Sequence, residues 1–454
     1  MSSVIKLRKG LDIRLQGKAE EQKLQLKSNG RFALVPDDFE GVTPKVVVRE
    51  GDHVLAGEAL FVNKACPEVK FASPVSGKVS AVVRGDRRKV LCVQVEADKE
   101  QQFADYGKKD VDKMDGKAVV DALLDAGIFG YISQLPYAVS TTPAVQPRAI
   151  FVSALRDKPL ACRFEYEVKG QEDDFVTGLK ALSKIAKTYL GLGIQPDFQA
   201  ELQKRDVEKY VELTIFDGKC PAGNVGVQVN HLAPVNKGEV VWTIGDPTVV
   251  LFIGRLLNTG RVNLKRTVAL CGSEVKKPCH ADMLVGEELS TLVANSYDAD
   301  HHVRIINGNV LTGRPTAKDG YLGAHASEIT IIPEGDDADE FAGWMMPRLK
   351  QFSTSHSYFS WLFGKKEYAL DARIKGGERH IIMSGEYDRV LPMDIYGEYL
   401  IKAIIAGDID KMEQLGIYEV SPEDFALAEF VDSSKLELQR IVREGLDNLR
   451  KENE

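Results

Sequence analysis

The chain has 454 residues, 44% of them hydrophobic and 28% charged, and a formal net charge of -8. That length is about three times a typical domain, so we expect three or four folded units. The acidic balance and the shortness of the basic runs argue against a nucleic-acid partner. No apolar run approaches the roughly 18 residues of a membrane span, so we expect no transmembrane segment.

Short strands with one buried face are expected in the first 100 residues. Apolar residues alternate with other residues at Val46 and Val48, at Leu60 and Val62, and at Val79, Ala81 and Val83. Turns are expected at Gly51-Asp52, Ser76-Gly77 and Gly85-Asp86. This pattern is typical of the barrel of a lipoyl- or biotin-carrier domain.

Lys64 is the only candidate for the modified lysine that a carrier domain presents at a hairpin tip. Its surroundings differ from those of a carrier, because the Met-Lys-Met triplet of biotin carriers is absent and Ser73-Pro74 lies too far along the chain for a lipoyl hairpin. The pattern favours a purely architectural use of the fold. Carrier function stays open as an alternative, which a mass increment on Lys64 would reveal.

The six cysteines do not predict a metal site or a cluster. No two of them are spaced as C-x-x-C, which argues against the usual iron–sulfur and structural zinc motifs. Cys271, Cys279 and His280 have no regular ligand spacing, and we interpret their proximity as coincidence. We expect no metal ligands in this chain.

Strands and helices alternate between residues 101 and 262, which predicts a parallel α/β layer. A helix is expected over 117–126, ended by Gly127, and a proline-punctuated loop over 130–147. The segments expected after them are a buried strand over 149–155, a helix with Phe175, Leu179, Leu182 and Ile185, and a strand over 211–216. The architecture is Rossmann-like but lacks the G-x-G-x-x-G sequence of dinucleotide-binding domains, because segment 191–196 has only two of its three glycines. We also expect Pro196 to prevent a helix from starting there, where its N-terminus would bind pyrophosphate.

The rest of the chain predicts a small mixed unit, a loop-rich region and a helical end. Strands are expected at 267–270 and 303–306, around a helical stretch near 285–292, which is consistent with a compact β-grasp unit. A loop-rich β region is expected over 310–382. In the tail, Ser421-Pro422-Glu423-Asp424 is typical of a helix start. The apolar residues of a last, bundle-packed helix are Leu438, Ile441, Val442, Leu446 and Leu449.

Several short sequences carry a resemblance to a known family. They are Lys9-Gly10-Leu11-Asp12, Val69-Lys70-Phe71, Phe216-Asp217-Gly218, Pro221-Ala222-Gly223, Pro234-Val235-Asn236, Val310-Leu311-Thr312-Gly313, Tyr321-Leu322-Gly323, Gly343-Trp344 with Met346-Pro347, and Arg389-Val390-Leu391-Pro392-Met393-Asp394. With these sequences and the order of its segments, essentially the whole chain resembles the A subunits of the bacterial sodium-translocating NADH:quinone reductase (Na+-NQR).

The resemblance implies an α/β and α+β multidomain fold, similar to the flavin- and NADH-binding subunit of complex I and to the C subunit of the Rnf complex. It implies a barrel-sandwich hybrid (biotinyl- or lipoyl-like) domain at 1–100, a Rossmann-like α/β domain at 101–262 and a β-grasp, SLBB-like domain at 263–333. A loop-rich β region at 334–390 and a helical C-terminal domain at 391–454 complete the expected organisation.

Departures from these relatives imply that the chain holds no redox centre. The glycine-rich loop that wraps FMN in the complex I relative corresponds to residues 127–133, which carry bulky side chains here. No cysteine follows Cys279 to hold an iron–sulfur cluster, and the flavin-attachment sequence Ser-Gly-Ala-Thr is absent. We expect no cofactor on this chain, with FAD, FMN, riboflavin and iron–sulfur centres in other subunits and quinone as the substrate.

A quinone site needs an apolar slot and one or two hydrogen-bond donors for the carbonyls. In light of the resemblance, two loops are candidates. The expected quinone-proximal residues are Leu34, Pro36 and Phe39 in the first loop and Phe129, Tyr131 and Pro136 in the second. We expect no catalytic, cofactor-binding or metal-binding residues in the chain. The alternative, that these are ordinary core or subunit-interface residues, stays open.

The function implied by the resemblance is that of a peripheral subunit on the cytoplasmic face of the bacterial inner membrane. Its partners would be the other subunits of a pump that oxidises NADH, reduces quinone and exports sodium, above all an integral membrane subunit. Sodium should cross elsewhere, because ion paths need polar groups inside membrane spans. The alternative is a soluble FMN and NADH dehydrogenase subunit of complex I or Rnf type, which FMN binding by the purified chain would favour.

Overall fold

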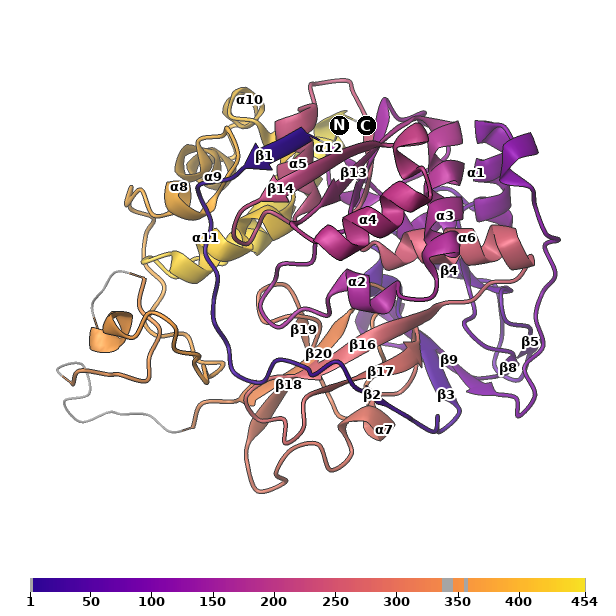
Figure 1. Ribbon diagram of the computed structural model, residues 1–454, viewed down its shortest axis with the longest axis horizontal. Coiled ribbons are helices and arrows are strands. Elements are labelled where there is room, and N and C mark those ends of the chain that lie inside the picture. Colours follow the sequence, from indigo (N-terminus) through magenta and orange to yellow (C-terminus); the bar gives the residue numbers. More distant parts are fainter. Residues whose placement is uncertain (1–2, 337–345, 355–357, 454) are drawn as a thin grey trace.

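The computed structural model describes residues 3–336, 346–354 and 358–453, so the motif residues Gly343 and Trp344 lie outside the described residues. Figure 1 shows an α/β layer with its helices, further sheets on one side of it, and the C-terminal helices beside it. The strands are β1 (Ser3–Lys6), β2 (Lys23–Leu24), β3 (Arg31–Leu34), β4 (Pro44–Val46), β5 (His53–Val54), β6 (Ala59–Asn63), β7 (Lys70–Ala72), β8 (Gly77–Arg84), β9 (Val90–Ala97), β10 (Ser133–Leu135), β11 (Val139–Ser140), β12 (Ala149–Ser153), β13 (Lys187–Leu192), β14 (Glu212–Asp217), β15 (Val241–Ile244), β16 (Lys265–Cys271), β17 (Cys279–Leu284), β18 (Val303–Asn307), β19 (Arg314–Thr316) and β20 (Glu328–Pro333).

The α-helices are α1 (Gly116–Asp125), α2 (Phe164–Glu167), α3 (Glu172–Ile185), α4 (Pro196–Lys204), α5 (Val225–Leu232), α6 (Thr248–Thr259), α7 (Ser290–Val293), α8 (Tyr387–Val390), α9 (Gly397–Ala406), α10 (Ile409–Gln414), α11 (Ala426–Val431) and α12 (Leu438–Asn453). Short 3-10 turns join them, among them η1 (Pro36–Asp38), η4 (Phe129–Tyr131), η7 (Phe359–Leu362) and η9 (Pro422–Phe425).

The central sheet has the strand order β1-β14-β13-β12-β15-β10-β11. Its first five strands in that order run parallel, and β10 and β11 add an antiparallel hairpin. Alternate residues of β12 enter different cores: Ile150 and Val152 pack with α3 and α6, whereas Phe151 packs with Val229 of α5. Helices therefore cover both faces of the sheet, as the near-continuous apolar strand 149–155 predicts.

The N-terminal barrel consists of a four-stranded sheet, β3-β9-β8-β5, and a three-stranded sheet, β4-β6-β7. The predicted alternation is confirmed in the first half of β8, where Gly77 and Val79 are buried and Lys78 and Ser80 are exposed. It is wrong for β6, in which Leu60–Asn63 are all buried. Lys64 is exposed in the loop between β6 and β7, and its backbone N–H donates to the Thr43 carbonyl over 2.7 Å. The absence of a modification on Lys64 stays a prediction.

The first residues of the chain belong to other sheets. Strand β1 pairs in parallel with β14 of the central sheet, and β2 pairs in parallel with β17. The two sheets of the barrel begin at Arg31, so β1 and β2 lie outside them, and the boundaries of 1–100 stay a prediction. Both β1 and β2 are largely exposed edge strands, with Val4 54% exposed, and so lack the alternating pattern that predicts a half-buried strand.

Two expectations for the α/β layer are also corrected. The expected loop at 130–147 contains the strand pair β10 and β11, which is too short to show a period. Pro196 does not block a helix but stands at the first position of α4. Proline is favourable there because the first helical N–H has no intrahelical acceptor.

Beside the central sheet and the barrel, the structure has a six-stranded sheet, which we call the third sheet, with the order β19-β18-β20-β16-β17-β2. The predicted strands at 267–270 and 303–306 are confirmed, whereas the helical stretch is only α7. After Pro333, the described residues form no strand and have one isolated bridge, between Leu15 and Tyr368. The expected β character of 334–390 is therefore wrong for the described part, in which segments such as Gly376-Gly377 lie exposed without a neighbouring strand.

The predicted helical tail is confirmed. Ser421 and Asp424 form a capping box before α11, with the Asp424 carboxylate accepting from both the N–H and the hydroxyl of Ser421. In α12, Val442, Leu446 and Leu449 are fully buried.

Helices α3 and α6 are in close backbone contact at two glycines, Gly178 of α3 and Gly254 of α6. A Cβ on Gly178 would lie 2.2 Å from the Val250 carbonyl oxygen, and a Cβ on Gly254 would lie 1.8 Å from the Asp174 carbonyl oxygen. Both obstructing atoms belong to the backbone, so a Cβ at either position could be accommodated only if the two helices moved apart.

We predict that Gly178→Ala and Gly254→Ala each lower the free energy of unfolding by about 1–3 kcal/mol through overpacking, although alanine favours a helix by about 1 kcal/mol. Urea unfolding followed by circular dichroism measures the loss. The control is Gly377→Ala, because a Cβ on Gly377 meets nothing within 4 Å. Losses no larger than that of the control would contradict the role of the two glycines.

Candidate functional site

A cavity of about 430 Å³ opens at the carboxyl ends of β12 and β15. The strand order changes direction at this place in the sheet. Strand β13, which follows β12 in the chain, pairs with one edge of β12, and β15 pairs with the other edge. Open α/β sheets place ligands in such a crevice. We call it the switch-point cavity. Its walls come from the central sheet (Arg156, Asp246), from the third sheet region (His325) and from the C-terminal helices (Glu423, Arg443).

Arg156 is the centre of a buried ion network on the cavity wall. Its guanidinium contacts Glu167 over 2.8 Å and Asp246 over 2.9 Å, and it donates to the Thr248 hydroxyl over 2.6 Å. Burial lowers the pKa of Arg156, but the two carboxylates outweigh it and hold the pKa above its usual value. Arg156 is therefore a fixed cation whose charge is already compensated.

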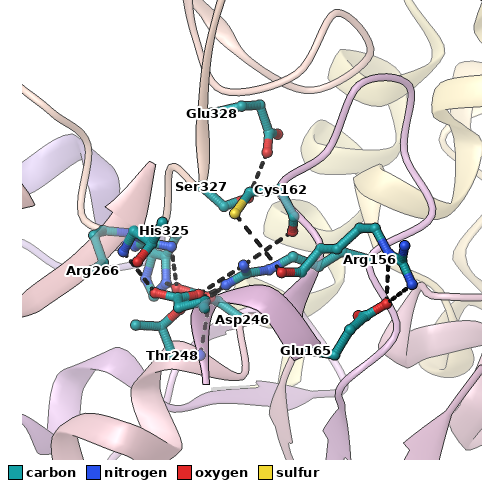
Figure 2. Close-up of polar contacts among 12 residues, drawn as sticks. Arg156, Cys162, Glu165, Asp246, Thr248, Arg266, His325, Ser327 and Glu328 are labelled. Carbon is teal, nitrogen blue, oxygen red and sulfur yellow. Dashed lines mark hydrogen bonds and ion pairs between the residues drawn. The ribbon is translucent and has the colours of Figure 1, made fainter. Parts of the chain in front are cut away.

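Asp246 joins the two sheets. Its second oxygen lies 3.1 Å from the buried guanidinium of Arg266 on β16 and 3.9 Å from Nδ1 of His325. Figure 2 shows Arg266 and His325 on one side of Asp246. Burial alone would raise the pKa of Asp246, but Arg266 and Arg156 outweigh it and hold the pKa well below its usual range. Asp246 therefore stays a carboxylate at all physiological pH values.

The other cations of the wall are paired as well. Lys158 forms an ion pair with Glu423, and Arg443 pairs with Asp447 and donates to the carbonyls of Tyr137 and Ala138. Among the described residues that line the cavity, no lysine or arginine is left without an anionic partner. The cavity thus offers little net attraction to a phosphate group.

A helix N-terminus at the cavity is occupied by the chain itself. Helix α5 begins at Val225, and a Cβ on Gly226 in its first turn would lie 2.3 Å from the Asp424 carboxylate. Asn224 donates to the same carboxylate over 3.1 Å. Such an N-terminus attracts anions, and here the capping-box aspartate already lies against it.

Tyr131 supplies an unused hydrogen-bond donor. Its side chain is 2% exposed and lines the cavity, and its hydroxyl has no hydrogen-bond partner. The ring packs edge-on against Phe39 at 5.0 Å, His325 at 5.6 Å and Phe252 at 5.8 Å between centroids. Burial raises the pKa of Tyr131 well above its usual value, so the hydroxyl keeps its proton. A buried donor without a partner costs free energy unless a ligand or water accepts from it.

Tyr131 alone of the six predicted quinone-proximal residues lines the cavity. The other five, Leu34, Pro36, Phe39, Phe129 and Pro136, are buried. The structure brings Phe39 into contact with Tyr131, whereas Phe129 packs edge-on against Trp242 at 5.3 Å. Contact of these residues with quinone stays a prediction.

Sequence reasoning missed Arg156, Asp246 and His325. A usable signal existed for the first two, because Arg156-Asp157-Lys158 follows the buried strand β12 and Gly245-Asp246 follows β15. Charged residues directly after parallel strands meet at one edge of a sheet. His325 had no such signal, because a loop between β19 and β20 carries it.

Two further features bear on chemistry. Within residues 3–336, 346–354 and 358–453, no group of three or more His, Cys, Asp and Glu side chains is arranged to hold a metal ion. Over the same residues, no helix combines the length and the apolar character needed to cross a bilayer.

Three family models match the chain. They are described as the NqrA N-terminal barrel-sandwich hybrid domain (residues 5–98), the NqrA second alpha/beta domain (residues 114–262) and the NQRA C-terminal domain (residues 267–318). The first two confirm the barrel and the mixed α/β layer that follows it.

Full-length relatives carry the same description. The A subunit of the Na(+)-translocating NADH-quinone reductase of Yersinia pestis bv. Antiqua (strain Angola) is 32% identical over 452 residues, which cover 99% of this chain and 100% of the relative. Its counterpart of the same name from Haemophilus influenzae (strain PittGG) is 32% identical over 455 residues with the same coverage. An NAD+-reducing [NiFe]-hydrogenase in the H2-reduced state aligns with a TM-score of 0.38 at 13% identity over 74% of this chain and 61% of that chain.

We predict that Arg156→Met lowers the free energy of unfolding by about 3–5 kcal/mol, because it leaves two buried carboxylates without their shared cation. Urea unfolding measures the change. Arg205→Met is the matched control, because Arg205 pairs with Glu201 and Asp173 at the surface and should cost at most about 1 kcal/mol. Equal costs for the two variants would contradict the network.

Asp38 should make stability fall as pH rises. Burial raises its pKa from 3.8 to about 6, although the Ala324 N–H and Arg314 lower it. The folded chain thus keeps a proton that the unfolded chain loses, so the free energy of unfolding decreases between about pH 4 and pH 6. We predict that Asp38→Asn removes this decrease in urea titrations across that range. Asp37→Asn, which removes a surface partner of Lys89, should leave the decrease in place; an unchanged slope in Asp38→Asn would contradict the assignment.

Proposed function

Because the chain belongs to the family of A subunits of the Na+-translocating NADH-quinone reductase, we propose that it scaffolds that complex and contacts quinone through the switch-point cavity. As a member of this family, the chain is one component of an enzyme that couples electron transfer from NADH to quinone to sodium transport. The role of this chain within the enzyme, as a scaffold that contacts quinone, is our inference.

We propose the same domain boundaries that the sequence predicts. We assign a barrel-sandwich hybrid to 1–100 with its core from Arg31, a Rossmann-like domain to 101–262 and a β-grasp, SLBB-like domain to 263–333. A connecting region at 334–390 and a helical domain at 391–454 follow. The strand order β14-β13-β12-β15 supports the Rossmann-like assignment. We regard the fold as related to the flavin- and NADH-binding subunit of complex I.

We assign the redox cofactors of the complex (FAD, FMN, riboflavin and iron–sulfur centres) to other subunits. The charge distribution in the cavity supports this, because Arg156 is compensated by Glu167 and Asp246 and because Asp424 lies at the N-terminus of α5. A dinucleotide or FMN phosphate would face carboxylates instead of free donors. The alternative of an independent FMN and NADH dehydrogenase subunit is less favoured for the same reason.

We place the chain on the cytoplasmic face of the inner membrane, against an integral membrane subunit of the complex, with the sodium path in the membrane subunits. Membership of a sodium-translocating complex supports a membrane-bound setting.

The hydroxyl of Tyr131 is the observation that carries the quinone contact. A quinone head is neutral, planar and apolar, and it presents carbonyl acceptors, so it needs an apolar wall and a donor more than a free charge. Tyr131 offers a protonated donor without a partner, and Leu135 and Leu155 add apolar wall nearby. Phe39, whose ring packs edge-on against that of Tyr131, then acts by holding the Tyr131 side chain in place.

We predict that Tyr131→Phe raises the quinone concentration for half-maximal activity of the reconstituted complex by about five-fold, from the loss of roughly 1 kcal/mol of hydrogen bonding. Stability should not fall, because the hydroxyl has no partner within the chain. Reduction of the flavins by NADH, measured separately, should not change.

Phe129→Leu is the matched control, because Phe129 lies in the same 3-10 turn without lining the cavity. It should leave the quinone dependence unchanged. If Tyr131→Phe has the same quinone dependence as the unmodified complex, with assembly confirmed, quinone binds elsewhere in the complex and the six residues are structural.

A further inference from the structure

Large apolar side chains are exposed together on two neighbouring stretches, residues 346–354 and 358–366, which we call the apolar-basic surface. Their exposed fractions are 60% for Met346, 43% for Leu349, 58% for Phe359, 46% for Trp361, 61% for Leu362 and 51% for Phe363. The stretches lie side by side, because the Phe359 N–H donates to the Pro347 carbonyl over 3.3 Å and the Lys366 ammonium donates to the Leu349 carbonyl over 2.7 Å. The surfaces of soluble monomeric proteins rarely expose a large apolar patch unless it binds a partner or a membrane.

Buried contacts hold these side chains in an outward orientation. Ser360 is fully buried between Phe359 and Trp361, and its carbonyl accepts from the Tyr368 hydroxyl over 3.2 Å. Tyr368 is itself buried and packs against Phe352 at 5.6 Å. The turn is therefore anchored at its base, and its apolar side chains are presented to the outside by the fold.

The charge of the surface is opposite to that of the chain. Residues 346–366 contain four cationic side chains (Arg348, Lys350, Lys365 and Lys366) and no acidic one, whereas the whole chain has a net charge of -8. Lys350 and Lys365 are exposed, and the Lys366 ammonium lies 5.8 Å from the Phe363 ring centroid. Lysines beside exposed aromatic and aliphatic side chains are typical of segments that lie in the interface of a bilayer with anionic lipids.

We propose that the apolar-basic surface binds directly to an anionic phospholipid bilayer, with Phe359, Leu362 and Phe363 inserted among the headgroups and the lysines on lipid phosphates. Figure 1 draws this part of the chain in orange at the edge of the molecule, away from the sheets. A protein surface as the occupant would need acidic side chains placed opposite these lysines, whereas an anionic bilayer presents phosphates to the lysines and acyl chains to the apolar side chains over its whole surface. This contact is separate from the proposed quinone site, and neither requires the other.

The test uses the purified full chain and sedimentation with vesicles. The chain should bind vesicles rich in phosphatidylglycerol and bind phosphatidylcholine vesicles at least about five-fold more weakly, since each lysine near an anionic surface contributes about 1 kcal/mol. Leu362→Glu should weaken binding to phosphatidylglycerol vesicles by about ten-fold or more, because it replaces an inserted apolar side chain with a charge that the lipid repels. Lys365→Gln should weaken the same binding by about five-fold.

Ile194→Glu is the matched control, because Ile194 is 62% exposed, like Leu362, but lies in the loop between β13 and α4. It should bind vesicles like the unmodified chain. Quenching of tryptophan fluorescence by brominated lipid should occur in the unmodified chain and be weaker in Trp361→Phe.

Three results would overturn the proposal. The first is absence of vesicle binding by the unmodified chain, and the second is equal binding by Leu362→Glu and Ile194→Glu. The third is that Leu362→Glu binds vesicles normally but fails to assemble with the other subunits, which would assign the surface to a membrane-protein partner. None of these results bears on the quinone contact, which is measured by the quinone dependence of the assembled complex.

Discussion

The arrangement of the domains depends on one buried carboxylate, that of Asp246. It follows strand β15 of the central sheet, and it is contacted by Arg156 after the end of β12 and by Arg266 from β16 of the third sheet. Glu167 extends the connection, because it contacts Arg156 and accepts from the Thr267 backbone N–H over 3.0 Å. Removing one member of such a network leaves an uncompensated charge in a site that water does not reach, which costs far more than the intact network contributes. The two sheets are thereby held in one relative position.

The same network decides what the cavity can bind. Charges that hold the sheets together are not free to attract a ligand, and the N-terminus of α5 at the cavity already faces Asp424. What remains on the wall is apolar surface, carboxylates such as Glu40 and Glu328, and neutral donors, of which the Tyr131 hydroxyl is buried and unpartnered. Many folds of this kind place a nucleotide at this edge of the sheet, whereas here the cations at the edge are paired with carboxylates of the chain itself.

Elements with a strong local pattern could be predicted from the sequence, and elements fixed by distant contacts could not. Helix α12 and the capping box of Ser421 and Asp424 follow from spacing and local hydrogen bonding alone. Strands β1 and β2 have no such pattern, because they exist only through pairing with β14 and β17, some 200 residues or more away in the chain. The candidate site divides in the same way: Tyr131 was found through its loop and the resemblance, whereas the contact between Asp246 and Arg266 depends on how two sheets meet.

The N-terminal segment connects the α/β layer with the apolar-basic surface. Residues 7–11 lie along the central sheet and the C-terminal helices, since Leu11 donates to the Cys220 carbonyl and Gly10 to the Arg389 carbonyl. A few residues later, Gln16 donates to the Tyr368 carbonyl and Tyr368 donates back to Arg14, at the base of the apolar-basic surface. The segment then continues to β2 in the third sheet, beside β17. The surface that we assign to lipid is thus attached by backbone hydrogen bonds to the same extended strand that is attached to the α/β layer. Binding of the apolar-basic surface to a bilayer would therefore also orient the α/β layer to which this segment is attached.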